Sequence, residues 1–288
     1  MAAPENFSIL TNRESVIAYI RKVLDYTEDK KYIIMDMGKI KNTDALTVSL
    51  VIAIMMDSSQ QNLKSFVKYA SVRIPPRNSE PGMIFRKSHF DDTVMTGNAN
   101  QNYFMSRTDK IVNEKFTKEI IEFAYKKGIK DARTILNPIL VEIFSNTNNH
   151  ASKDNRKVPW FLSIVEDDER LCFSVIDLGI GIYESLKTSN ALRHLPQPEF
   201  NVIRDMYDND QSRYLASQIP NGVYSSTKKS FRGKGLKEIY EKANHSTTCK
   251  KFVIITNKAM VNLLDIASFC VDTSFSFNGT AFYWEMTK

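Results

Sequence analysis

Residues 138–152, Pro138-Ile-Leu-Val-Glu-Ile-Phe-Ser-Asn-Thr-Asn-Asn-His-Ala-Ser152, carry three polar side chains at a regular spacing. Glu142, Asn146 and His150 are each four residues apart, so on an α-helix they drift by about 40° per step and share one face. The opposite side of that helix is apolar and can anchor it in a core, through Ile139, Leu140, Ile143 and Phe144. The stretch predicts an amphipathic helix with a polar file of Glu, Asn and His.

Two interpretations of this polar file stay open when it is taken alone. A carboxylate can orient or deprotonate a water molecule and an amide oxygen can bind Mg²⁺, so the helix could supply a metal-nucleotide site. The same residue types are common on solvated helix faces, so the file could also be ordinary surface. Motifs further along the chain are needed to choose between the two.

Three glycine-containing motifs follow the predicted helix. They are Asp177-Leu-Gly-Ile-Gly181 after an apolar run, Arg232-Gly-Lys-Gly-Leu236 before a helical pattern, and Asn278-Gly-Thr280 near the end of the sequence. Together with the polar file, the order E-x-x-x-N-x-x-x-H, D-x-G-x-G, G-x-G-L and G-T resembles the GHKL ATP-binding superfamily. That superfamily includes type II topoisomerases, ATP-dependent chaperones, MutL-type repair proteins, histidine kinases and anti-sigma serine kinases. The resemblance covers roughly residues 110–288.

The resemblance implies an adenine site around the first and third glycine motifs. Asp177 would accept a hydrogen bond from the exocyclic amine of adenine, and Thr280 would support the water network on that side. Gly179 and Gly181 remove side chains where the backbone must bend or approach the nucleotide closely. An ordinary turn is the alternative interpretation of D-x-G-x-G in isolation.

The second glycine motif predicts a phosphate site. Gly233 and Gly235 stand just before a predicted helix, where free backbone N–H groups and the positive end of the helix dipole can receive phosphates. Lys234 would add a positive charge, Arg232 is either a second cation or a surface residue, and Leu236 completes the motif.

The resemblance also assigns roles to the polar file. Asn146 would be the Mg²⁺ ligand and Glu142 the general base for water, while His150 would contact phosphate or cap the helix. Histidine kinases commonly carry asparagine at the position of Glu142, whereas ATPases and anti-sigma serine kinases carry glutamate. The chain therefore looks nearest to the anti-sigma serine-kinase branch, with ATP and Mg²⁺ as its cofactors.

Composition indicates a globular chain without disulfides. The sequence has 288 residues, of which 42% are hydrophobic and 25% charged, and its three cysteines are far apart, as in proteins of a reducing compartment. The longest apolar run, residues 45–56, is much shorter than the roughly 20 residues of a membrane span, and no signal-peptide pattern stands at the start. We expect a cytoplasmic protein that does not associate with membranes. The net charge of +6 is dispersed, so nucleic acid is not an expected partner.

The first 74 residues predict a small α/β layer. Apolar periodicity indicates a helix over residues 14–26, a strand over 31–36, a largely buried helix over 45–57 and a strand over 65–72, with Thr43 or Asp44 as a helix cap. The segment Ile33–Leu46 resembles the strand, loop and helix of a STAS domain, the fold of anti-sigma factor antagonists, although it lacks glycines in the loop. Antagonists carry a phosphorylatable serine after the loop aspartate, whereas Ala45 follows Asp44 here.

Apolar patterning further along the chain predicts a helix over residues 113–127 with Gly128 as its C-cap, a helix from about residue 131 that is punctuated by Pro138, and strands over 251–257 and 276–285. Between the two parts, Pro75-Pro76 and Pro81-Gly82 indicate an irregular connection.

These elements predict a two-domain protein of α/β class. A STAS-like domain (1–74) would be followed by an irregular linker (75–108) and by a GHKL-type α+β two-layer sandwich (109–288) with an ATP lid at about 183–231. The leading functional expectation is a bacterial-type Mg-ATP-binding regulator with slow ATP hydrolysis, whose N-terminal domain contacts a protein partner. The alternatives are an anti-sigma-type serine/threonine kinase and a module that binds ATP without turnover; whether the protein forms a homodimer stays open.

Overall fold

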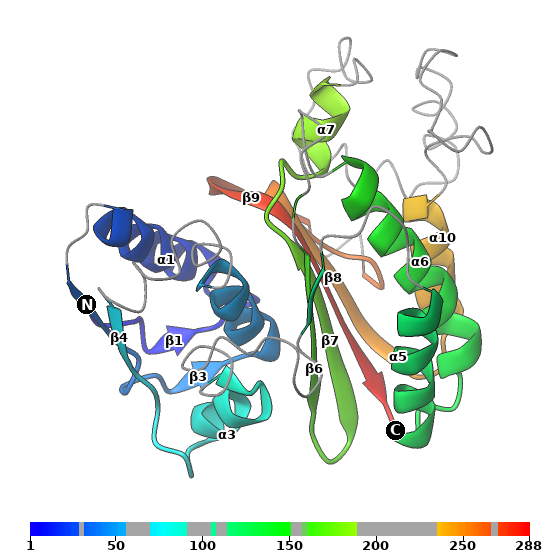
Figure 1. The fold of residues 1–288 in the computed structure, drawn as a ribbon, viewed down its shortest axis with the longest axis horizontal. Helices are drawn as coiled ribbons and strands as arrows, with labels where there is room; N and C mark the ends of the chain where they lie inside the picture. Colours follow the sequence, from blue (N-terminus) through cyan, green and yellow to red (C-terminus); the bar gives the residue numbers. More distant parts are fainter. Residues whose placement is uncertain are drawn as a thin grey trace. The chain divides into compact units, whose positions relative to one another are not determined.

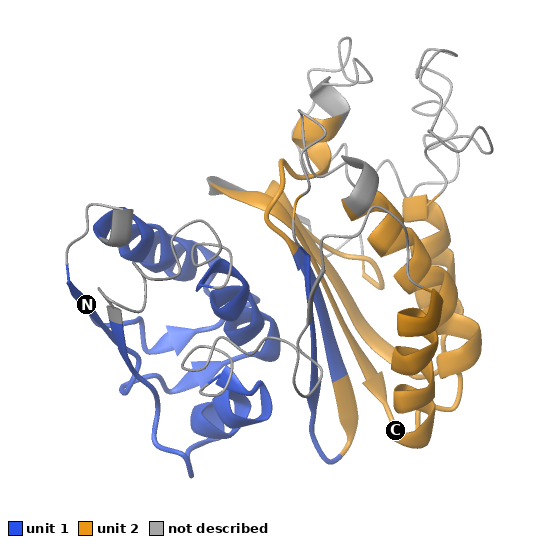
Figure 2. Ribbon diagram, viewed as in Figure 1, with its two compact units in different colours: residues 1–107, 159–168, 172–176 blue, residues 108–158, 169–171, 177–288 orange. Residues whose placement is uncertain are grey.

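A computed structural model describes residues 1–28, 32–55, 70–90, 105–107, 114–150, 158, 160–188, 235–265 and 270–288. These residues form a mixed α/β structure, the class that the sequence predicts. The chain divides into two compact units, coloured blue and orange in Figure 2. Unit 1 comprises Met1–Arg107, Pro159–Asp168 and Cys172–Ile176, and unit 2 comprises Thr108–Val158, Glu169–Leu171 and Asp177–Lys288.

Unit 1 contains the predicted α/β layer. Its elements up to Arg73 are β1 (Asn6–Phe7), α1 (Arg13–Glu28), β2 (Ile33–Asp36), β3 (Asn42–Thr43), a helix over 45–55 and β4 (Ala70–Arg73). The strand pairs β1–β3 and β2–β4 are both parallel, and a parallel bridge joins Ala2 to Asp36. Parallel strands need helical crossovers, and α1 and the helix over 45–55 supply them. The predicted helix, strand, helix, strand order is therefore present.

The helix over 45–55 is buried along almost its whole length, including the hydroxyl residues Thr47 and Ser49. Asp44 caps it, because its carboxylate accepts hydrogen bonds from the Thr47 backbone N–H at 2.7 Å and from the Thr47 hydroxyl at 2.8 Å. Burial raises the pKa of Asp44, and hydrogen bonds from Ser8, Thr47 and Leu10 oppose that rise. One of the two predicted caps is thus identified as Asp44.

The stretch 75–108, expected to be irregular throughout, contains regular structure in its described parts. Helix α3 spans Glu80–Lys87, and strand β5 spans Met105–Arg107. Ser79 caps α3 by accepting a hydrogen bond from the backbone N–H of Gly82 at 3.1 Å, and Pro81 stands in the first turn of the helix. Proline is favoured there because the first N–H groups of a helix have no partner within it. Pro81 thus marks the start of a helix, while Pro75 and Pro76 lie in irregular chain before it.

Five strands form the larger sheet, in the order β5-β6-β7-β9-β8. The new strands are β6 (Trp160–Glu166), β7 (Arg170–Asp177), β8 (Cys249–Asn262) and β9 (Cys270–Thr287). Strands β8 and β9 pair antiparallel and extend well beyond the predicted 251–257 and 276–285. Phe252 stacks on Trp284 across this pair, with ring centroids 5.5 Å apart.

Four helices of unit 2 complete the described fold: α5 (Glu114–Lys126), α6 (Ala132–His150), α7 (Ile182–Thr188) and α10 (Gly235–His245). In Figure 1, α5, α6 and α10 lie together on one side of β8 and β9. The predicted C-cap of α5 is confirmed, since Gly128 has a φ of +99° and the N–H of Ile129 bonds back to Ala124. Helix α6 continues through Pro138, which was expected to interrupt it.

A carboxylate ties the start of α6 to the far end of α10. Asp131, just before α6, accepts hydrogen bonds from Ser246, Thr247 and Thr248, which form the turn between α10 and β8. Burial alone would raise the pKa of Asp131, but the hydrogen bonds from Thr248, Ser246 and Thr247 lower it below its ordinary value. This contact fixes the two helices that carry the candidate site.

Among the helices that the structure describes, none combines the length and the apolar composition that crossing a bilayer would require.

Candidate functional site

The polar file of the opening stretch is carried by α6, as the sequence predicts. Glu142 and Asn146 are half-buried, while Ile139, Leu140, Ile143 and Phe144 on the other side of the helix are at most 1% exposed. The amide nitrogen of Asn146 is buried, and no described residue offers it a hydrogen-bond partner. A buried amide nitrogen without a partner is uncommon, because its desolvation is not compensated. The backbone of His150 closes α6, and its side chain lies outside what the structure describes.

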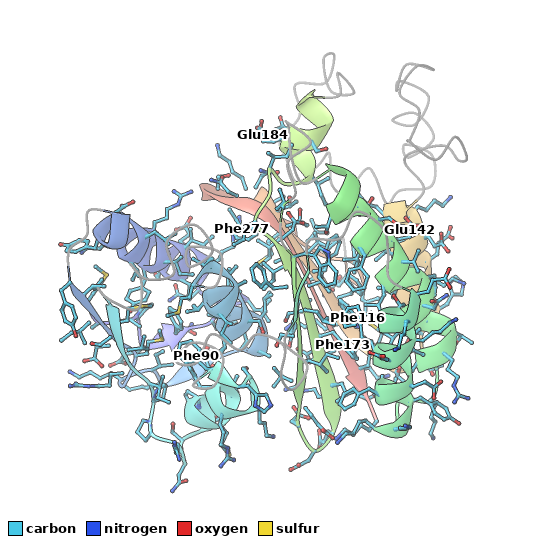
Figure 3. The ribbon with its side chains drawn as sticks, viewed as in Figure 1. Phe90, Phe116, Glu142, Phe173, Glu184 and Phe277 are labelled. Carbon is cyan, nitrogen blue, oxygen red and sulfur yellow. The ribbon has the colours of Figure 1, made fainter. Side chains whose placement is uncertain are left out.

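The start of α10 meets this file at Gly235, where any side chain would displace the Glu142 carboxylate. A Cβ atom added to Gly235 would overlap Oε2 of Glu142, lie 3.1 Å from Cδ of Glu142 and lie 3.6 Å from Nδ2 of Asn146. Figure 3 labels Glu142 where α6 and α10 run side by side. The Glu142 carboxylate therefore faces the N-terminal end of a helix, where backbone N–H groups point outward and partial positive charge accumulates.

The electrostatic setting of Glu142 raises its pKa. Burial is the larger cause, and the negative charge of Glu238, in the first turn of α10, is the second. A carboxylate with a raised pKa is a better proton acceptor than an exposed one. Leu236, the last residue of the G-x-G-L motif, is 8% exposed and so anchors α10 by packing.

Asp177 ends β7 and is 4% exposed. Its Oδ1 accepts a hydrogen bond from the backbone N–H of Gly179 at 3.0 Å, and its Oδ2 accepts a longer one from the Thr147 hydroxyl at 3.5 Å. The backbone N–H and the hydroxyl of Thr280 also bond to this carboxyl group. The structure thus brings three sequence-predicted residues, Asp177, Gly179 and Thr280, into direct contact.

Burial raises the pKa of Asp177 to about 6, and the hydrogen bonds from Gly179, Thr280 and Thr147 moderate the rise. The group is therefore ionised at neutral pH and accepts hydrogen bonds with both oxygens. A buried carboxylate with acceptor capacity suits a ligand that presents N–H donors.

Two glycines shape the turn that follows Asp177. Gly279 has a φ of +126°, and a Cβ there would overlap the carbonyl oxygen of Asp177 and lie 3.0 Å from Cα of Leu178. Gly181 has a φ of +78°, and a Cβ there would overlap the side chain of Asn257. Both positions need glycine for conformation and for space. The D-x-G-x-G and G-T motifs are thus parts of one packed arrangement.

Three residues of this arrangement escaped the sequence analysis. Thr147 follows Asn146 on α6 and touches Asp177, so it connects the polar file to the end of β7. Thr256 and Asn257 lie on β8 and bond to the backbone of residues 180–183. A weak signal for Thr147 existed, since it lies next to a predicted ligand. Nothing in the local sequence marks Asn257, because its role depends on a bulge formed by pairing with β9.

Several predicted residues cannot be placed. Arg232, Gly233 and Lys234 lie outside the described residues, as does the predicted lid at 183–231 apart from residues 183–188, which belong to α7. The part of the phosphate motif that the structure describes is therefore the pair Gly235 and Leu236.

The described residues could bind a hard metal ion only together with water and the phosphates of a ligand. They contain no cluster of three or more His, Cys, Asp or Glu side chains that could hold a metal by themselves. Mg²⁺ commonly takes one or two protein oxygens and fills its remaining positions with water and substrate phosphates. Rotation of the Asn146 amide by 180° exchanges its oxygen and nitrogen, so its buried end can present an oxygen to such an ion. Glu142 and Asn146 are compatible with this mode of binding.

Compared with models of known protein families and with curated proteins, the chain matches none. The candidate site accordingly rests on its own geometry.

Proposed function

We propose that residues 109–288 form a GHKL-type domain that binds Mg-ATP. The observation that carries the proposal is the close approach of Gly235 to Glu142, with Asn146 alongside. A glycine-started helix that meets a carboxylate and an amide on a neighbouring helix supplies a cradle for phosphates next to groups that can act on water and metal. Every residue of this cradle, and Asp177 with its hydrogen-bond partners Gly179, Thr147 and Thr280, belongs to unit 2.

The adenine end of the site would be the carboxyl group of Asp177. At neutral pH this group is ionised, and it can accept a hydrogen bond from the exocyclic amine of adenine. Guanine carries an oxygen acceptor at the corresponding position, which an ionised carboxylate repels. Thr280 and Thr147 would hold the carboxylate and share its hydrogen bonds with the ligand. The site should therefore prefer ATP over GTP.

The phosphate end would be the start of α10, an 11-residue helix whose first N–H groups and dipole favour an anion. Asn146 would hold Mg²⁺, and when bound the ion would neutralise phosphate charge. Arg232, Gly233 and Lys234 would extend this end of the site, and His150 would contact phosphate or cap α6.

Glu142 would act as the general base. Its half-buried position and the nearby charge of Glu238 raise its affinity for a proton, which suits a group that removes one from an attacking water or hydroxyl. Water as the acceptor gives hydrolysis, and a serine or threonine hydroxyl of a partner protein gives phosphotransfer. We favour slow hydrolysis, with phosphotransfer of the anti-sigma kinase type as the alternative and ATP binding without turnover as a third.

The α/β layer of unit 1 would serve as the interaction arm of a cytoplasmic regulator. Its parallel strands and the buried helix over 45–55 are compatible with a STAS-like domain, which supports a protein partner rather than a nucleic acid or a membrane. Phosphorylation after the loop aspartate is not expected, because Ala45 has no hydroxyl and Asp44 caps the helix. A homodimer remains an alternative assembly.

Calorimetric titration with Mg-ATP, followed by incubation with γ-labelled ATP and cell lysate, tests the proposal. We expect saturable binding of Mg-ATP, and a loss of binding by about 1–3 kcal/mol in Asp177→Asn, the scale of a hydrogen bond to a charged group. Released phosphate would identify an ATPase, a labelled protein would identify a kinase, and neither would identify a binding module. Absence of ATP binding by the wild-type protein would reject the proposal.

A further inference from the structure

We propose that Asn257 and Thr256, two neighbouring residues of β8, are positioning residues that hold the turn after Asp177 in its nucleotide-binding geometry. The inference rests on the proposed function and adds to it two residues outside every motif that the sequence presents. The contacts of these two residues with the turn join parts of the chain that are 74 residues apart.

The carboxamide of Asn257 bonds to the turn with both of its ends. Its Nδ2 donates to the carbonyl oxygen of Ile180 at 2.9 Å, and its Oδ1 accepts from the backbone N–H of Tyr183 at 3.1 Å. Asn257 itself is 3% exposed. Both contacts need an amide, because a carboxylate lacks the donor and an aliphatic side chain lacks donor and acceptor. One side chain thereby fixes the turn on either side of Gly181.

The hydroxyl of Thr256 completes the set. It accepts a hydrogen bond from the backbone N–H of Ile182 at 2.8 Å and can donate to the carbonyl oxygen of Gly279 at 3.2 Å. Ile182 and Tyr183 are the first two residues of α7, so the two side chains of β8 cap a helix that belongs to a distant part of the sequence. The same hydroxyl joins the D-x-G-x-G turn to the G-T motif.

The backbone of β8 is distorted in a way that serves these contacts. Asn257 has a φ of +47°, uncommon for a residue other than glycine, and the register with β9 shifts on both sides of it. The bulge turns the Asn257 side chain onto Gly181, where an added Cβ would lie 2.7 Å from both Cγ and Nδ2 of Asn257. Strained backbone of this kind persists only where the surrounding contacts hold it, and it is common at ligand sites.

These contacts control the position of the side of the turn that would face a ligand. Asp177 is fixed by β7, whereas Gly179 to Gly181, which the adenine ring would approach, belong to no strand in the part of the chain that the structure describes. The contacts from β8 therefore set how closely the turn approaches a ligand bound at Asp177. Loss of either side chain should weaken adenine binding even where the fold survives.

Titration of the full chain with Mg-ADP and with adenosine tests this inference. Asn257→Gly removes the carboxamide while relieving the positive φ, which offsets part of the loss of stability. Thr256→Val keeps the shape of threonine without its hydroxyl, and Thr256→Ser restores the hydroxyl. Asn262→Gly, at the last residue of the same strand, is the matched control.

We expect Asn257→Gly and Thr256→Val to weaken both ligands by about tenfold, equivalent to about 1.4 kcal/mol. Thr256→Ser and Asn262→Gly should bind like the wild type, and urea unfolding of each variant should confirm that it is folded during the titration. Wild-type affinity in folded Asn257→Gly and Thr256→Val, or failure of Thr256→Ser to restore binding, would overturn the inference while the proposed function stands. Failure of the wild-type protein to bind either ligand would overturn both.

Discussion

At the scale of single residues, Asp177 is buried and accepts hydrogen bonds from several neighbouring donors. Its pKa of about 6 lies above the value of about 4 for an exposed aspartate, so its ionised form is disfavoured in the folded protein. A group whose pKa is raised on folding reduces stability once the pH exceeds its unfolded pKa. The ionised carboxylate at neutral pH is therefore maintained at the expense of stability, which is common for ligand-binding groups.

The raised pKa of Asp177 predicts a pH dependence of adenine binding. If the ionised carboxylate accepts the adenine amine, affinity for adenosine should be constant above about pH 7 and should fall about tenfold as the pH drops one unit below 6. Calorimetry with adenosine measures this without the titration of phosphate groups. The Asp177→Asn variant is the control, because its weak residual binding should not change over the same range. A flat profile in the wild type would remove Asp177 from the adenine contact.

Substitutions of Glu142 and of Asn146 should have different effects on nucleotide affinity and on turnover. A base acts in the transition state, whereas a metal ligand also holds the ground state. Glu142→Ala should keep Mg-ATP affinity nearly intact and lower turnover by about 100-fold or more, the usual contribution of a positioned base. Asn146→Ala should weaken binding in a Mg²⁺-dependent manner. Calorimetry with and without Mg²⁺, combined with a phosphate-release assay, separates the two effects.

One outcome would contradict the role given to Glu142. Loss of nucleotide binding in Glu142→Ala would mean that the carboxylate supports the fold or holds the metal. Glu142→Gln helps to decide, since it keeps the shape of the side chain beside Gly235 and removes only its charge.

At the scale of elements, α6 and α10 carry the two halves of the proposed phosphate site, and Asp131 joins the two helices. Its carboxylate accepts from the Ser246 hydroxyl at 2.7 Å and from the Thr247 backbone N–H at 3.0 Å. Because these contacts are only partly shielded from water, each is weaker than it would be in the core. Together they still fix the end of α10 opposite Gly235.

Asp131→Ala should therefore destabilise the protein by about 1–3 kcal/mol at neutral pH. Since folding lowers the pKa of Asp131, its contribution is present above the unfolded pKa of about 4 and is lost as the pH falls through the folded pKa. Urea unfolding at several pH values should show the difference between variant and wild type shrinking in acid. Glu122→Gln, which breaks the exposed pair with Arg133, is the control and should leave the midpoint unchanged.

Local patterns predicted most of the elements because their causes are local. The apolar spacing in α5 and α6, and the positive φ of Gly128, follow from neighbours within a few residues. The helix α3 was missed because Pro81 and Gly82 suggested a turn, whereas Ser79 provides a cap that makes the same residues a helix start. The lengths of β8 and β9 were underestimated because each strand is stabilised by the other.

The relative placement of the candidate residues follows from the sequence where a motif carries its own geometry. Asp177, Gly179 and Thr280 meet as expected, and Glu142 and Asn146 share a face. The contact between Gly235 and Glu142 depends on how α6 packs against α10, which sequence spacing does not specify. The contacts of Asn257 depend on a register shift between β8 and β9, which the sequence does not reveal. Assignment to the GHKL and STAS families, the division at 75–108 and the cofactors ATP and Mg²⁺ stay predictions.

At the scale of the whole molecule, the candidate site draws on α6, α7, α10, β8, β9 and the end of β7, all within unit 2. Binding of the proposed ligand would therefore stabilise several elements together. A ligand that binds only the folded state adds about 2.7 kcal/mol to the free energy of unfolding at 100 times its dissociation constant.

Mg-ADP at such a concentration should raise the unfolding midpoint in urea by the corresponding amount. Mg-GDP at the same concentration should raise it much less, because its guanine oxygen would face the Asp177 carboxylate. Equal stabilisation by both nucleotides would contradict adenine selectivity. In the Asp177→Asn variant, stabilisation by Mg-ADP should be reduced.

Three glycines of unit 2 have a consequence for how this protein can evolve. Every single-base missense change at a glycine codon adds a Cβ atom. At Gly279 that atom would strike the backbone of Asp177, at Gly181 it would strike Asn257, and at Gly235 it would push the Glu142 carboxylate aside. At Gly38 it would meet only the side chains of Arg73 and Asp36, at 3.2 Å. Missense changes should therefore be tolerated least at Gly279 and Gly181, whose backbone φ is also positive. A change at Gly235 requires the Glu142 carboxylate to move, and a change at Gly38 requires only a small shift of the two side chains that it meets.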